Sequence, residues 1–126
     1  MEALLNAEKI EINFTFNEDN IFCEYGKLDF SFFEGAAIIN SISVYLKRNC
    51  VGTRLVNEME IIARQNGLKI IEVPASPTKE AILFWKSLGY KPAFDEDRYW
   101  VKKISHSYKE SSWDIPQGVV VMTKQI

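Results

Sequence analysis

The sequence predicts an α/β chain of the α+β type, in which a mixed, mostly antiparallel sheet contains a central parallel strand-helix-strand crossover. Two patterns predict this fold class. Residues 9–44 repeat short runs of β-branched and aromatic residues separated by turn residues, which is typical of antiparallel hairpins. After Gly52 the apolar residues recur at helical spacing, and a short apolar run follows. The 126 residues suffice for one core, so residues 1–126 are expected to form a single domain.

Composition and charge argue against several classes of protein. The formal net charge is -2, so no basic surplus predicts nucleic acid as a partner. No apolar run approaches the roughly 20 residues that span a bilayer, and the N-terminal residues lack a signal-peptide pattern, so we expect a cytoplasmic protein without a membrane partner. Cys23 and Cys50 are isolated thiols that we expect to be reduced, and His106 is the only histidine. Neither a metal site nor a Ser-His-Asp triad is therefore expected.

The first half of the chain is expected to hold three or four antiparallel strands. Within residues 9–44 the apolar runs are separated by turn signals at residues 17–20, at Gly26 and at Glu34–Gly35. The runs between these turns are rich in aromatic and β-branched residues, which favour strands.

A helix is expected over residues 53–65. Its apolar residues fall on one face, whereas Glu58, Glu60 and Arg64 are expected to point away from that face. Asn66–Gly67 supplies a left-handed stop at its C-terminal end.

The second half begins with a short strand and another helix. Residues 68–73 form an apolar run typical of a strand covered on both faces. Ser76–Pro77 predicts the start of the next helix, with the serine hydroxyl as its cap, and Gly89 predicts its end. The final residues 119–126 supply a closing strand.

Residues 95–116 have no dominant period and are not assigned. Within them, Arg98–Trp100 and Lys102–Lys103 are open to two interpretations. A solvated loop and edge strand with two buried rings is favoured over a lid above an acceptor.

Residues 47–55 have the composition of a phosphate-binding turn. Such a turn needs backbone amides that converge on one point at a helix N-terminus, with small residues where the ligand approaches. Lys47 and Arg48 precede the turn, Gly52 permits close approach, and Thr53 is expected to cap the first helical turn. The alternative is an ordinary basic loop between a strand and a helix, because one glycine is a weak signal.

The order of these motifs resembles the Gcn5-related N-acetyltransferase (GNAT) family over residues 38–92. The phosphate turn of that family reads Gln or Arg, two residues, Gly, one residue, then Gly or Ala. It is matched here by Lys47, Arg48, Asn49, Cys50, Val51 and Gly52. The second family signature, Ala-x-x-Phe-Tyr-x-x-x-Gly-Phe, falls on Ala81, Phe84, Trp85, Gly89 and Tyr90.

The resemblance implies a GNAT-like acyl-CoA N-acyltransferase fold with a splayed cleft for acetyl-CoA, used as a co-substrate without a metal. The pyrophosphate would rest on backbone amides at the start of the helix. The pantetheine arm would pair with the main chain of the preceding strand, as an added strand does. The residues implied in cofactor binding are Ile42, Ser43, Val44, Lys47, Arg48, Asn49, Cys50, Val51, Gly52, Thr53, Thr78 and Trp85.

Three positions depart from the family pattern. Cys50 stands where glycine is usual, and a residue with a Cβ does not freely adopt positive φ, so the turn is expected to be tighter or shifted. Trp85 stands where many members carry a tyrosine whose hydroxyl can protonate the CoA thiolate, and an indole is a far poorer acid. Thr78 replaces a frequent asparagine.

Catalysis requires a neutral amine and a polarised thioester carbonyl. A main-chain amide near Val44 would polarise the carbonyl. Glu34, in the turn before the cofactor strand, and Glu24 or Tyr25, expected on a neighbouring strand, are the candidate bases. Each also fits an ordinary solvated or half-buried role, and a water relay is an equal alternative.

Members of the family usually begin with a strand and two helices that form one wall of the acceptor pocket. Here the first 44 residues read almost entirely as strands, so we expect those helices to be absent and the acceptor site to be open. A homodimer is one way to cover the apolar surface left behind. We expect an N-acetyltransferase acting directly on an amine of a protein, peptide or small molecule. The alternative is a catalytically inactive acyl-CoA-binding or protein-interaction module of the same fold.

Overall fold

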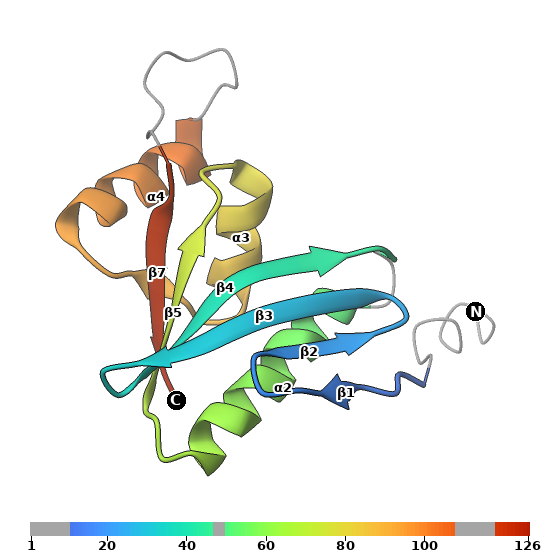
Figure 1. Cartoon of the computed structure of the whole chain (residues 1–126). Helices are drawn as coiled ribbons and strands as arrows, with labels where there is room; N and C mark the ends of the chain where they lie inside the picture. The colour runs from blue at the N-terminus through green and yellow to red at the C-terminus, as the bar shows by residue number, and fades with distance from the viewer. Residues whose placement is uncertain (1–10, 47–49, 108–117) are drawn as a thin grey trace. The chain divides into compact units, whose positions relative to one another are not determined.

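The computed structural model describes residues 11–46, 50–107 and 118–126 (Figure 1). The chain divides into two compact units, Met1–Lys69 and Ile70–Ile126. Each unit is described on its own. None of the helices in the described part of the chain has the length and apolar character that a bilayer crossing requires.

The described part of the first unit is an antiparallel sheet with one helix. Its elements are β1 (Thr15–Phe16), β2 (Asn20–Cys23), β3 (Gly26–Phe33), β4 (Ala36–Val44) and α2 (Val51–Gln65). Successive strands pair antiparallel, in the order β1-β2-β3-β4. The predicted hairpins are confirmed, with turns at Glu24–Tyr25 and Glu34–Gly35. The turn signal expected at Gly26 is displaced, because Gly26 is the first residue of β3.

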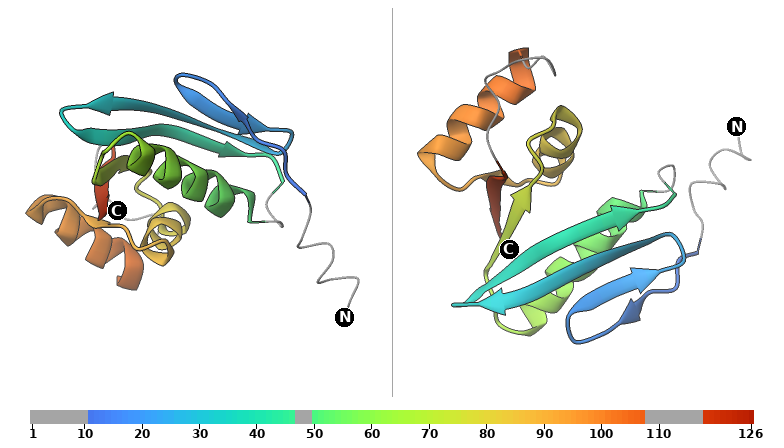
Figure 2. Two further views of the ribbon diagram at one scale, coloured as in Figure 1. Left: turned by 90° about the horizontal axis from the view of Figure 1, so that it is seen from below. Right: turned by 45° about the horizontal axis from the view of Figure 1, so that its top comes forward.

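The core of this unit lies between α2 and one face of the sheet. α2 packs on β2, β3 and β4 (Figure 2). Leu28 and Ile39 from the sheet and Leu55 and Met59 from the helix are fully buried. The prediction that Glu60 points away from the core is wrong, because Glu60 is 5% exposed and its carboxylate lies 3.8 Å from the Arg64 guanidinium.

A β-bulge interrupts β4. Asp29 pairs with Ser41 and Phe30 pairs with Ile39, so Asn40 has no partner on β3. The extra residue shifts the alternation, and Asn40 and Ser41 are both exposed. The polar middle of β4 therefore lies on the face opposite α2.

α2 ends as predicted but begins earlier than residue 53. Gly67 has φ 75°, its N–H donates to the Arg64 carbonyl, and the Leu68 N–H donates to the Ala63 carbonyl. These two bonds form a Schellman motif, which needs a left-handed residue after the helix. The predicted stop at Gly67 is confirmed.

The described part of the second unit is an antiparallel three-stranded sheet with two helices. Its elements are β5 (Ile70–Ala75), α3 (Lys79–Ser87), β6 (Lys91–Pro92), α4 (Asp95–Ser107) and β7 (Val120–Gln125). β7 pairs with β5 on one side and with β6 on the other. The predicted strands around residues 68–73 and 119–126 are therefore present.

The start of α3 differs from the prediction, whereas its end agrees. The cap is Thr78 and not Ser76, and the Thr78 hydroxyl accepts a hydrogen bond from the Ala81 N–H at 3.2 Å. Gly89 has φ 90°, and the Tyr90 N–H donates to the Trp85 carbonyl. Gly89 therefore closes the helix as expected.

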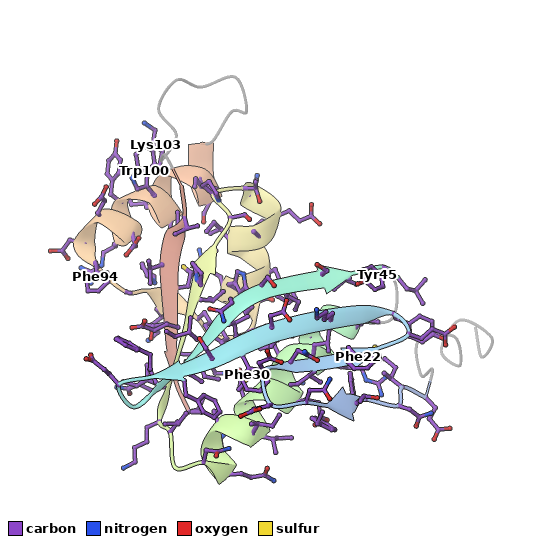
Figure 3. All side chains as sticks on the ribbon, in the orientation of Figure 1. Phe22, Phe30, Tyr45, Phe94, Trp100 and Lys103 are labelled. Carbon is purple, nitrogen blue, oxygen red and sulfur yellow. The ribbon has the colours of Figure 1, made fainter. Side chains whose placement is uncertain are left out.

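α4 was not predicted, and it replaces the loop and edge strand that we favoured for this stretch. The Asp97 carboxylate accepts the Phe94 N–H at the helix start and the Val121 N–H on β7. Tyr99 is 56% exposed and Trp100 is half-buried, so the two rings are not buried as expected. Lys103, which projects from α4 with Trp100 (Figure 3), lies 5.6 Å from both ring centroids.

Candidate functional site

The end of β4 and the start of α2 meet around Gly26. Gly26 pairs with Val44 across β3 and β4, and the Tyr45 N–H donates to the Tyr25 carbonyl at 2.7 Å. A Cβ on Gly26 would lie 2.8 Å from the Ser43 carbonyl oxygen and 3.1 Å from Cγ1 of Val51. Only glycine therefore permits this close approach of β3, β4 and α2.

α2 begins without a side-chain cap. Its N-cap residue, Cys50, has φ 52° and ψ 32°, is exposed, and makes no side-chain hydrogen bond to the helix. The first amides of a helix have no acceptor within the helix itself, and the first turn of α2 carries no acidic side chain. No carboxylate of the first turn therefore neutralises the positive end of the α2 helix dipole.

Cys50 corrects one sequence expectation. We expected its Cβ to disfavour positive φ and to make the turn tighter or shifted. The structure instead holds Cys50 in the left-handed region, the conformation that the glycine of the family motif adopts easily. A non-glycine residue is strained there by about 1–2 kcal/mol, and such strain occurs preferentially at functional sites.

Two other residues of the turn lie inside the helix. Gly52 is the second residue of α2 and is buried, so it is not the loop position that we expected. Thr53 is the third helical residue and is half-buried, so it is not the cap. Val51, between the cap and Gly52, is 1% exposed. Lys47, Arg48 and Asn49 lie outside the described residues, and their role in cofactor binding stays a prediction.

The strand residues implied in pantetheine binding lie after the bulge. Ile42 and Val44 are half-buried on the α2 face, and Ser43 is exposed between them. Strand alternation turns Ser43 towards the uncovered face. Their backbone role stays a prediction.

The two implied cofactor residues of the second unit have structural roles. Thr78 caps α3. Trp85 is 3% exposed, with its ring 5.1 Å from that of Tyr90 and 4.9 Å from that of Phe84. Packing therefore accounts for the indole at position 85, and its contact with a cofactor stays a prediction.

The three candidate bases lie in turns. Glu24 and Tyr25 form the β2–β3 turn and are not on a strand, as we had expected. Glu34 is exposed in the β3–β4 turn with φ 48°. Ten residues of extended chain separate it from Val44, which is about 33 Å. Tyr25 is thus brought beside the end of β4, whereas Glu34 is not.

One carboxylate that the sequence reasoning missed lies beside the bulge. Asp29 accepts a hydrogen bond from the Ser41 hydroxyl at 2.7 Å, and its carboxylate lies 3.4 Å from Lys27 Nζ. Because its neighbours Leu28 and Phe30 point to α2, Asp29 points to the uncovered face. The sequence signal was a single acidic residue on the exposed side of an alternating strand, which does not distinguish a functional residue from a solvated one.

The site and the fold together define an α+β protein in which a bulged strand leads into a helix with an uncapped N-terminus. Structure comparison identifies proteins with a similar fold. The anti-CRISPR protein AcrVA5 matches with a TM-score of 0.57 and 21% identity, over 83% of this chain and 95% of that chain. The IAA acetyltransferase from Bacillus cereus ATCC 14579 matches with a TM-score of 0.62 and 14% identity, over 85% of this chain and 77% of that chain.

A third match was solved with coenzyme A. The PaiA N-acetyltransferase from Thermoplasma acidophilum, in complex with coenzyme A, has a TM-score of 0.58 and 13% identity, over 86% of this chain and 62% of that chain. This chain therefore spans less than two thirds of that enzyme. No protein-family model and no curated protein sequence matches the chain. The structural matches assign the fold: the chain has the acyl-CoA N-acyltransferase fold of the GNAT family, as the motif resemblance predicted.

Proposed function

We propose that the protein is an acetyl-CoA-dependent N-acetyltransferase that binds the diphosphate of CoA at the N-terminus of α2. The observation that carries the proposal is the start of this helix. Cys50 keeps a left-handed conformation there without capping the helix, and no acidic side chain occupies the first turn. Backbone amides at such an end attract phosphate through hydrogen bonds and the helix dipole.

β4 supports the same assignment. It leads from the bulge at Asn40 to the start of α2, with the exposed Ser43 near its end. A bulge disrupts the local ladder and re-aims backbone groups. In the proposed complex, the main chain of Ile42–Val44 pairs with the pantetheine arm, which brings the thioester towards the bulge.

The proposed reaction is a direct transfer. The neutral amine attacks the thioester carbonyl carbon, a C–N bond forms, the C–S bond breaks, and the acetylated amine loses one proton while the CoA thiolate gains one. Asp29 replaces Glu34 as our candidate for the base, acting directly or through water, because it lies beside the bulge. The buried Trp85 indole is a poor acid, so water is the proposed proton donor to the thiolate.

The substitution Thr53→Glu tests the diphosphate site. A carboxylate at the third helical position stabilises a helix N-terminus by about 0.3–1 kcal/mol. The same carboxylate repels a diphosphate bound there. We expect an unchanged or higher Tm, together with a Kd for CoA raised about tenfold or more in calorimetric titration.

Thr53→Gln is the matched control, because it has nearly the same shape without the charge. It should bind CoA almost as the unmodified protein does. Equal Kd values for the glutamate and glutamine variants would show that the diphosphate binds elsewhere.

The second candidate function is an acyl-CoA-binding module without turnover. The buried Trp85, in the position of the family tyrosine, favours it. Release of free CoA thiol from acetyl-CoA in the presence of mixed amines distinguishes the two functions. Binding of CoA without thiol release would assign the module.

A further inference from the structure

A groove in the first unit lies outside the proposed acetyl-CoA site. It has a volume of about 570 Å³ and runs between the β1–β2 turn, the second half of β3 and the C-terminal half of α2. Two of its lining residues are largely covered: Phe30, labelled in Figure 3, is 4% exposed, and Ile62 is half-buried. α2 rises about 1.5 Å per residue, so a groove beside residues 58–66 lies well away from the helix start at Val51.

The walls of the groove are exposed apolar side chains. Phe16 is 51% exposed, Phe32 is 46% exposed and Ile61 is 43% exposed. They come from β1, β3 and α2, so three elements contribute to one apolar surface. Exposed apolar residues gathered in one concave place mark an interaction site more often than scattered ones do.

The wall at β3 also has an unpaired backbone edge. The Phe30 N–H donates to the Asp19 carbonyl at 3.0 Å, just before β2 begins at Asn20. Because a strand repeats every two residues, Phe32 directs its N–H and carbonyl to the same edge. No strand pairs with that edge within residues 11–46, 50–107 and 118–126. Such an edge accepts an extended peptide as an added strand.

The charge of the groove is negative. Glu18, in the β1–β2 turn, and Glu58, on α2, line it, and none of its lining residues in the described part of the chain is a lysine or an arginine. Among the described residues, neither carboxylate forms an ion pair. A ligand with cationic side chains would therefore find two carboxylates that are free to bind it.

We propose that this groove docks an extended segment of a partner protein in which apolar and basic residues alternate. The segment pairs with the backbone of Phe32, places apolar side chains against Phe16 and Ile61, and directs its cations to Glu18 and Glu58. This interaction does not require acetyl transfer, so it holds whether or not the protein is an active enzyme.

The first test uses NMR of the 15N-labelled 126-residue chain. The probe is a blocked hexapeptide of alternating lysine and valine, and its control replaces each lysine with glutamate. We expect amide shifts around Phe32, Glu58 and Ile61 with the lysine peptide only. Shifts that map to α4 or to the uncovered face of the sheet would overturn the proposal.

Matched variants make the test specific. Ile61 and Leu83 are both 43% exposed, but only Ile61 lines the groove. Ile61→Ser should weaken the binding of the lysine peptide at least about fivefold by loss of apolar contact, and Leu83→Ser should not. Equal effects of the two substitutions would refute docking in the groove.

A second pair of variants tests the charge. The double substitution Glu18→Gln and Glu58→Gln should raise the Kd about fivefold, the size expected for two solvent-exposed ion pairs. Asp95→Asn with Glu96→Gln, two exposed acids on α4, is the control and should leave the Kd unchanged.

Light scattering of the Ile61→Ser variant tests whether a second copy of the chain occupies the groove. A fall in its molar mass would show that a second copy occupies the groove and would overturn the assignment to a partner.

Discussion

Gly26→Ala is the substitution that most directly tests the geometry of the proposed acetyl-CoA site. The new Cβ would lie 2.8 Å from the Ser43 carbonyl oxygen, 3.1 Å from a methyl carbon of Val51 and 3.2 Å from one of Leu55. Ordinary contact begins near 3.4 Å, so the carbonyl of Ser43 must move by about 0.6 Å. The start of α2 must yield as well, because two of the three contacts are to its first residues.

The expected cost follows from two opposing effects. Crowding of a packed site costs about 1–3 kcal/mol. Gly26 has no positive φ in the structure, so alanine also recovers about 0.5–1 kcal/mol by restricting the unfolded chain. We expect a net loss of about 1–2 kcal/mol in the free energy of unfolding, which corresponds to a fall in Tm of about 3–8 °C.

The same displacement should weaken CoA binding. In the proposed complex Ser43 lies beside the pantetheine, and Val51 offers one of the amides to the diphosphate. Since small misplacements of oriented groups are costly, we expect the Kd in calorimetric titration to rise about fivefold to tenfold.

Gly67→Ala separates binding from stability. Gly67 has open space around it and φ 75°, so alanine is strained there by about 1–2 kcal/mol through backbone conformation alone. It lies beyond the opposite end of α2 and should lower the Tm by a similar amount without changing the Kd. If both variants leave CoA affinity unchanged, the junction of β4 and α2 is not the cofactor site.

Three further predictions concern stability and are measured by thermal and urea unfolding. Cys50→Gly should raise the free energy of unfolding by about 1 kcal/mol, since glycine is unstrained at φ 52°; a loss would show that the thiol makes a stabilising contact. Thr78→Ala should lower it by about 1 kcal/mol through loss of the α3 cap, and no change would mean that water replaces the hydroxyl. Asp97→Ala should lower it by about 2–3 kcal/mol, because the N–H groups of Phe94 and Val121 lose their acceptor. An effect of Asp97→Ala below that of Thr78→Ala would contradict this account.

The elements with a regular apolar period could be predicted from the sequence. The hairpins of the first unit and the helix around residues 53–65 follow directly from strand and helix spacing. Asn66–Gly67 and Gly89 fixed the ends of two helices, because a left-handed residue after a helix is nearly a glycine requirement. These signals depend on neighbouring residues in the sequence, so the elements could be predicted without knowledge of tertiary contacts.

α4 was missed because one of its buried positions is polar. Asp97, Val101 and Ile104 are buried at helical spacing, but an aspartate in that series breaks the apolar pattern. The acidic residues 95–97 were the available signal, since acids favour the first turn of a helix. The local sequence does not indicate that the Asp97 carboxylate accepts a hydrogen bond from an N–H on β7, because that strand is distant in the sequence.

The candidate site depends on strand register, which the sequence does not specify. Nothing in residues 26–44 indicates that Gly26 lies opposite Val44 or that Asn40 is the bulged residue. Register decides which residues face away from α2, so Asp29 was not among the candidate bases, which were Glu34, Glu24 and Tyr25. The phosphate turn was predicted by motif, but the conformation of Cys50 was not.

Position 50 shows how the site departs from local stability rules. Ser, Asp or Asn there would cap α2 and stabilise it by about 1 kcal/mol. Such a side chain would also occupy an amide of the first turn, and an aspartate would add a negative charge. Cys50 is strained and does not cap the helix. Among the described residues, neither the Cys50 side chain nor an acidic side chain of the first turn occupies the first amides of α2, as the proposed diphosphate site requires. Residues that lower stability and leave a binding group uncovered are expected at functional sites.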